Sequence, residues 1–156
     1  MDAQFRKATL EPHWTEIGLT ATLSLVGAVR RMHMQAHYTR LFTDDQGESC
    51  FEDLVIGLTQ ELSVPGADAL PIAPFLSSEG TFWVGGSATW KGDALHPAPR
   101  RYIIVTVQGE YEVTTSRGET RRFPAGSVVL TEDTTGKGHS VKHGDQTIAF
   151  CVALPT

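Results

Sequence analysis

The chain has 156 residues, of which 40% are hydrophobic and 20% charged, and its formal net charge is -5. This balance favours a single globular domain over a disordered chain. The excess of acidic over basic residues disfavours binding to nucleic acid or to an anionic membrane surface.

The cysteines and the apolar segments bear on the cellular compartment. Cys50 and Cys151 lie about a hundred residues apart, a spacing that excludes zinc-ribbon and thioredoxin motifs and favours free thiols in a reducing compartment. The longest uncharged apolar run, residues 17–29, is shorter than the ~18 residues that span a bilayer. Its basic pair, Arg30-Arg31, follows the run, whereas a signal peptide has its charges first. We therefore expect a cytoplasmic protein with no membrane contact.

The N-terminal part of the chain predicts one long strand. Apolar side chains occupy alternate positions through residues 17–29, which is typical of a half-buried strand. An exposed apolar edge is a liability that pairing removes, so we expect this strand to contribute to a homodimer. We accordingly divide the chain into an N-terminal extension, residues 1–36, and a barrel domain, residues 37–156.

Short strands separated by turns fill the remainder of the chain. The predicted strands are 51–58, 81–90 with a bulge at Gly85-Gly86, 102–107, 110–115, 120–123, 128–131, 139–142 and 147–154. Residues 63–78 and 91–100, which hold most of the prolines, are predicted loops. Strands and turns at this spacing, without a sustained helical stripe, predict an all-β sandwich or barrel.

A more specific pattern begins at His96. After it come Gly109, which closes a strand, then Pro124-Ala-Gly126, then a glycine-containing turn that leads into His139. This order resembles the two motifs of the cupin family of small barrels. The resemblance implies an all-β, cupin-like antiparallel jelly-roll β-barrel with an N-terminal strand extension.

The resemblance extends beyond these motifs. Residues 48–53 and 132–139 are similar to a group of small single-domain cupins, and the similarity covers about residues 38–155. Because cupins host many reactions as well as plain binding roles, the fold that the resemblance implies is more specific than the function.

The metal motif of the family is incomplete in this chain. Its second histidine falls on Ala98 and its glutamate on Tyr102, which leaves His96 and His139 as the motif-matched ligands. A tight divalent site needs three or four protein ligands. The sequence therefore favours a protein without a cofactor, while iron, zinc, manganese or nickel stay open. Candidates for a third ligand are His33, His37 and Asp133.

Three titratable residues are expected to meet in the barrel mouth: His96, Tyr102 and His139. Imidazoles exchange protons near neutral pH, and a phenol donates a hydrogen bond to an oxyanion. The set predicts acid–base chemistry inside the barrel, such as isomerisation, decarboxylation, dehydration or cyclisation of a small organic substrate. This favours a lyase or isomerase over a metal-dependent oxygenase. The structural alternatives are a hydrogen-bonded core histidine and an ordinary barrel tyrosine.

Four further residues are predicted to bind the substrate. Arg100 or Arg101 is suited to a bidentate pair with a carboxylate, and Trp90 and Phe150 are suited to an apolar wall. Their alternatives are solvated charges at a strand start and core aromatic rings. A non-catalytic binding or sensing cupin, or a metal-dependent cupin enzyme, would use the same pocket.

Overall fold

The computed structural model describes residues 34–156, and this part of the chain contains twelve strands and no helix. The prediction of an all-β fold is confirmed. The predicted strand at residues 17–29 lies outside the described residues. Across residues 34–156 there is accordingly no helix long and apolar enough to cross a membrane.

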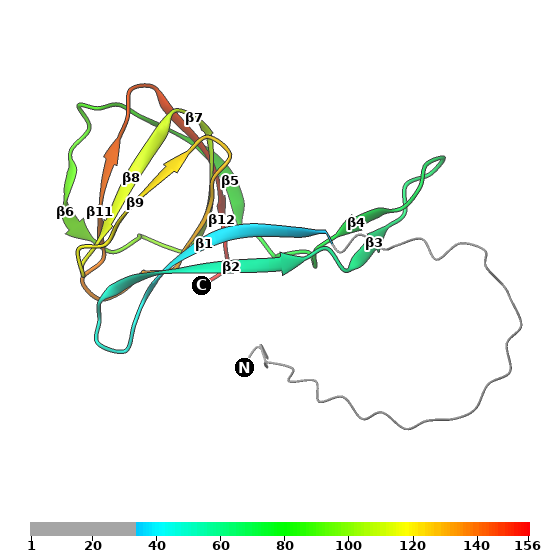
Figure 1. Cartoon of the computed structure of the whole chain (residues 1–156), viewed down its shortest axis with the longest axis horizontal. Helices are drawn as coiled ribbons and strands as arrows, with labels where there is room; N and C mark the ends of the chain where they lie inside the picture. The colour runs from blue at the N-terminus through cyan, green and yellow to red at the C-terminus, as the bar shows by residue number, and fades with distance from the viewer. Residues whose placement is uncertain (1–33) are drawn as a thin grey trace, which may run out of the picture. The chain divides into compact units, whose positions relative to one another are not determined.

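The larger sheet has six strands in the order β2-β1-β10-β7-β12-β5 (Figure 1). Its members are β1 (Gln35–Thr43), β2 (Ser49–Gly57), β5 (Gly80–Gly86), β7 (Tyr102–Gln108), β10 (Val128–Thr131) and β12 (Thr147–Ala153). β1 runs parallel to β10, whereas the other pairings are antiparallel. The sheet ends at β2 and at β5. It is therefore open and mixed, which differs from the closed antiparallel barrel that the sequence predicted.

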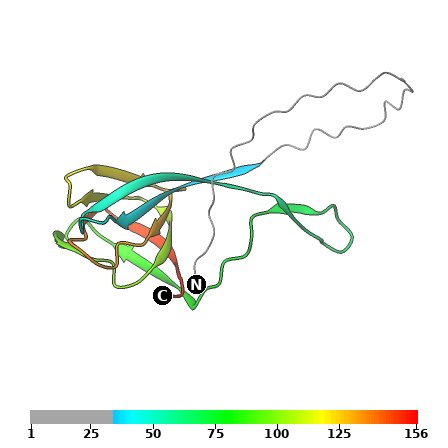
Figure 2. The ribbon, with the colours of Figure 1, turned by 90° about the horizontal axis from the view of Figure 1, so that it is seen from below.

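The smaller sheet has four antiparallel strands in the order β6-β11-β8-β9. Its members are β6 (Gly92–His96), β8 (Glu110–Thr115), β9 (Thr120–Pro124) and β11 (His139–His143). Two short strands, β3 (Gln60–Leu62) and β4 (Leu70–Ile72), form a hairpin that lies apart from both sheets in two perpendicular views (Figures 1 and 2). β4 and β6 fall in segments that were predicted to be loops.

The core lies between the two sheets. Leu41 and Val129 reach it from the larger sheet, and Tyr111, Val113 and Phe123 reach it from the smaller one. Within β8 the residues between these positions are less buried, because successive side chains of a strand point to opposite faces. Burying each such side chain stabilises the fold by roughly 1.5–3 kcal/mol. The packed centre leaves the ends and flanks of the sandwich for a functional site.

Candidate functional site

The two motif-matched histidines lie side by side at one end of the smaller sheet. His139 begins β11 and pairs with His96 at the end of β6. Their imidazole centroids are 5.1 Å apart, with the ring planes tilted by 43°. The glycine before His139 makes this approach feasible, because Gly138 has φ +69° and a Cβ added there would lie 2.1 Å from the His96 carbonyl carbon.

A buried carboxylate holds one of these imidazoles. His139 Nδ1 donates to Asp133 Oδ2 over 2.6 Å, and the exposed fractions of the two residues are 7% and 0%. Asp133 follows β10, and its carbonyl accepts from the Ala98 amide. The other carboxylate oxygen, Asp133 Oδ1, is buried and has no hydrogen-bond partner among the described residues. The sequence offered Asp133 as a candidate third metal ligand, whereas the structure makes it the partner of His139.

The second imidazole is oriented by its own strand. His96 is half-buried, and its Nδ1 lies 2.9 Å from the Ala94 carbonyl, to which it donates. With Nδ1 of both rings engaged, the Nε2 atoms are the ones that accept protons in the neutral histidines. The arrangement is chemically suited to proton transfer.

The described residues do not complete a metal site around this pair. Within residues 34–156, no group of three or more His, Cys, Asp or Glu side chains is placed to hold a metal ion. Asp133 is committed to His139, and two imidazoles alone do not fit a tight divalent site. We therefore derive no chemical step through a metal.

The remaining candidates for a third ligand do not join the pair. His37 pairs with Val55 on β2, whereas Ser49, at the other end of β2, donates to the Gly138 carbonyl over 2.7 Å. Six residues of extended strand separate these points by roughly 20 Å. His33 lies outside the described residues.

Tyr102 lies on the inner face of the larger sheet. It shares that face with Ile104 and Thr106 by strand alternation, and Ile104 packs against the core. Its ring meets the edge of Phe82 at a centroid distance of 5.4 Å. In the described part of the chain, no ring contact joins Tyr102 to either site histidine.

The predicted substrate-binding arginines are both engaged elsewhere. Arg101 donates to Glu132 and to the Pro155 carbonyl. Arg100 forms an ion pair with Glu79, and its Nε is buried without a partner in the described part of the chain. Arg100 Nε is therefore the donor that we consider for a ligand.

The predicted aromatic wall is divided between two faces. Phe150 alternates with the buried Ala149 and Cys151, so its ring is on the outer face, where it contacts Trp83 at 5.1 Å. Phe150 therefore lies on the face away from the core, and its substrate-binding role stays a prediction. Trp90 is about half exposed and meets the edge of a histidine ring, that of His143.

His143 belongs to a second polar cluster at the far end of β11. It shares a face with His139, as strand alternation predicts, and its ring lies 6.2 Å from that of Tyr111. Both His143 Nδ1 and the Tyr111 hydroxyl are buried, and neither has a hydrogen bond of good geometry within residues 34–156. The Thr106 side chain is the nearest polar contact of the Tyr111 hydroxyl. Burial lowers the pKa of His143 and raises that of Tyr111, so both groups stay neutral near pH 7.

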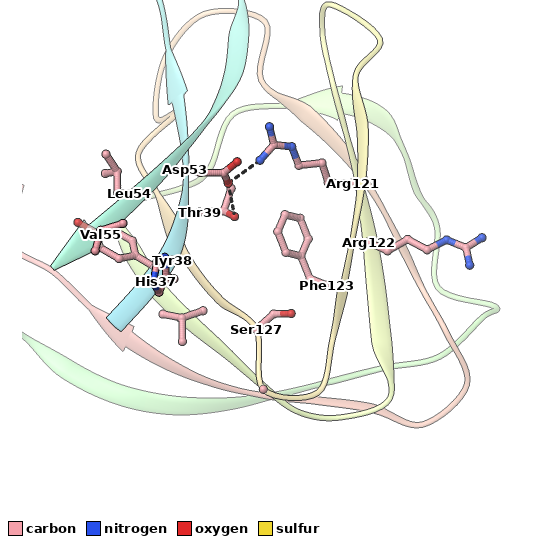
Figure 3. A pocket seen from close by; sticks show the side chains of 12 residues that line it. His37, Tyr38, Thr39, Asp53, Leu54, Val55, Arg121, Arg122, Phe123 and Ser127 are labelled. Carbon is pink, nitrogen blue, oxygen red and sulfur yellow. Dashed lines mark hydrogen bonds and ion pairs between the residues drawn. The ribbon is translucent and has the colours of Figure 1, made fainter. Parts of the chain in front are cut away.

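A groove of about 380 Å³ opens on the flank of the sandwich, between the β1–β2 pair and β9 (Figure 3). Arg121 and Asp53 face each other across it, and Phe123 lies between them and Ser127. None of the residues that the sequence singled out as catalytic or substrate-binding lines this groove. Sequence reasoning missed it because it forms between two sheet edges that are distant along the chain.

Comparisons with models of protein families and with curated proteins give no match to this chain. Its function is therefore argued from the site geometry and from the order of its strands.

Proposed function

We propose that this chain is a cupin-like, jelly-roll enzyme that carries out acid–base chemistry on a small organic substrate. The strand order supports the fold. Strands β5 to β12 form the orders β5-β12-β7-β10 and β6-β11-β8-β9, and a jelly roll likewise has eight strands in two sheets. β1 and β2 extend the first of these sheets beyond β10.

The observation that carries the chemistry is the buried His139–Asp133 pair beside His96. A carboxylate on Nδ1–H keeps the imidazole in the tautomer whose Nε2 is a base, and it stabilises the imidazolium that forms after proton uptake. The Asp133 carboxylate is fully buried and accepts this one hydrogen bond from the described residues, so its negative charge is directed largely at His139.

In the proposed reaction, His139 Nε2 removes a proton from a carbon next to a substrate carbonyl. The C–H electron pair moves onto the carbonyl oxygen to give an enolate, for which the Tyr102 hydroxyl is the assigned donor. Protonated His139 then returns this proton at a second position. Alternatively, an initially protonated His96 donates there, and His139 passes its proton to His96 to restore the pair. Arg100 Nε, which no described residue engages, is the proposed anchor for a substrate carboxylate.

Solvent-exchange spectroscopy tests this proposal without a known substrate. The full chain is incubated in D₂O with a panel of 2-oxo, 3-oxo and 2-hydroxy acids, and loss of the proton signals next to the carbonyl or hydroxyl carbon is followed by NMR. We expect enzyme-dependent exchange in at least one probe, lowered by about a hundredfold or more in His139→Gln.

Two further variants sharpen the assignment. Asp133→Asn should lower the rate and leave the folded structure in place, whereas Lys142→Gln, on the exposed face of the same strand, should keep the full rate. Full exchange activity in His139→Gln, or no exchange above the solvent rate in any probe, would contradict the acid–base proposal.

A further inference from the structure

The flank groove places a cation and an apolar surface together, away from the site histidines. Val128 lines the groove at the start of β10, and Asp133 follows the other end of that strand. About five residues of extended chain, or roughly 16 Å, separate the two positions. A ligand in the groove is therefore distinct from a substrate at His139.

Arg121 is the central polar group of the groove. It points inward from β9, its Nε donates to Glu119 over 2.7 Å, and its Nη1 donates to Asp53 over 2.7 Å. Its guanidinium also lies 4.8 Å from the centre of the Phe51 ring. These contacts hold the planar guanidinium of Arg121 in one orientation. Its Nη2 donates to no residue in the described part of the chain.

The protein partners of Arg121 are weak competitors for a ligand. The side chains of Asp53 and Glu119 are 74% and 50% exposed. Exposed ion pairs of this kind contribute little to stability, because water and salt screen both charges. An incoming carboxylate can replace Asp53 and take both Nη atoms at a small cost.

The rest of the groove is suited to a small apolar group of a ligand. Phe123 is buried beneath it, Val55 is half exposed at its wall, and Ser127 and His37 supply polar groups at the end away from Asp53 (Figure 3). A volume of about 380 Å³ is at the lower end of the range for small-molecule sites. One ring and one charged group fill such a space.

We infer that this groove binds a small carboxylate that carries an aromatic or other apolar ring, with Arg121 as the anchor. The carboxylate pairs with the Arg121 fork, and the ring lies over Phe123 against Val55. The neighbouring Arg122 has the same charge but points away from the groove toward Glu112 (Figure 3). It therefore serves as a matched control.

The test is an NMR titration of the full chain with benzoate and with its neutral isostere benzamide, followed through the backbone amides. We expect benzoate to shift the amides of Arg121 and Ser127 saturably, and benzamide to bind about tenfold more weakly. Arg121→Gln should weaken benzoate binding by about tenfold, whereas Arg122→Gln should change it by less than about twofold.

A second variant makes the result independent of any folding defect in Arg121→Gln. Asp53→Asn removes the competing carboxylate and keeps the arginine. It should tighten benzoate binding about threefold and leave benzamide binding unchanged. Equal binding of benzoate and benzamide, equal losses in the two arginine variants, weaker benzoate binding in Asp53→Asn, or shifts centred on His139 would each overturn the inference.

Discussion

Replacing Gly138 with alanine disturbs the contact that brings His139 beside His96. At φ +69° an L side chain costs about 1–2 kcal/mol. The added Cβ would also lie 2.1 Å from the His96 carbonyl carbon, where ordinary contacts begin at 3.4 Å. The ends of β6 and β11 must therefore move apart by more than an ångström, and forced overpacking of this kind costs about 1–3 kcal/mol. We expect a total loss of about 3 kcal/mol in the free energy of unfolding.

Gly118→Ala is the matched control. Gly118 also has a positive φ, +86°, in the turn between β8 and β9, but a Cβ added there meets no atom of residues 34–156 within 4 Å. It should cost only about 1 kcal/mol, because only the backbone conformation is penalised and the stiffer unfolded chain offsets part of that. Urea denaturation of the two variants measures the difference. Equal losses would refute the close backbone contact, and full proton-exchange activity in Gly138→Ala would refute its role in placing the histidines.

Three further predictions concern buried polar groups. Tyr111→Phe should leave stability unchanged or raise it by up to about 1 kcal/mol in urea denaturation, because the buried hydroxyl makes no hydrogen bond of good geometry with residues 34–156. Burial opposes ionisation of Glu132, but hydrogen bonds from Arg101 and Arg40 outweigh it and hold the Glu132 pKa below 4.5. Its ion pairs therefore stabilise the fold above that pH and are lost as the pH falls through the folded pKa. Glu132→Gln should lower the free energy of unfolding by about 1 kcal/mol at pH 7. Below pH 4.5 the stability of this variant should fall less steeply with pH than that of the unmodified protein. Burial lowers the pKa of His143 below 6.5, so on acidification the unfolded chain binds a proton at this residue before the folded chain does. Stability therefore declines as the pH falls below 6.5. The urea midpoint of His143→Gln should lack this decline.

Strands with strong alternation and clear turns were predictable from the sequence. The predicted bounds of β8 and β10 match the observed ones. Polar and apolar side chains alternate through most of β8, whereas β10 is a short apolar run that ends in a threonine, and turn residues flank both strands. β6 was predicted as a loop, since Gly92–His96 is short, lacks β-branched residues and pairs only with β11. Its pairing depends on a partner more than forty residues away, which local patterns do not report.

The site was predictable only where a motif pointed to it. The motifs placed His96 and His139 in one site, and the structure brings their rings within 5.1 Å, while their catalytic roles stay predictions. The pairing of Asp133 with His139 depends on how the turn between them folds. From the sequence alone, residues 133–139 are equally consistent with a turn that has no functional role. Strand alternation near Arg121 indicates only that it shares a face with Phe123. Its encounter with Asp53 follows from the way the two sheet edges meet.

The parallel pairing of β1 with β10 has a consequence for the order of folding. Thr39 lies opposite Val129, so this contact closes a loop of about 90 residues, whose closure entropy alone is about 4 kcal/mol. The β1–β2 hairpin forms from neighbouring residues and has no such barrier. We expect it to appear early and to dock late, after β7 and β10 have paired, with Leu41 open to solvent in the meantime. A folding phase in the millisecond-to-second range should therefore report the arrival of this hairpin on the sandwich.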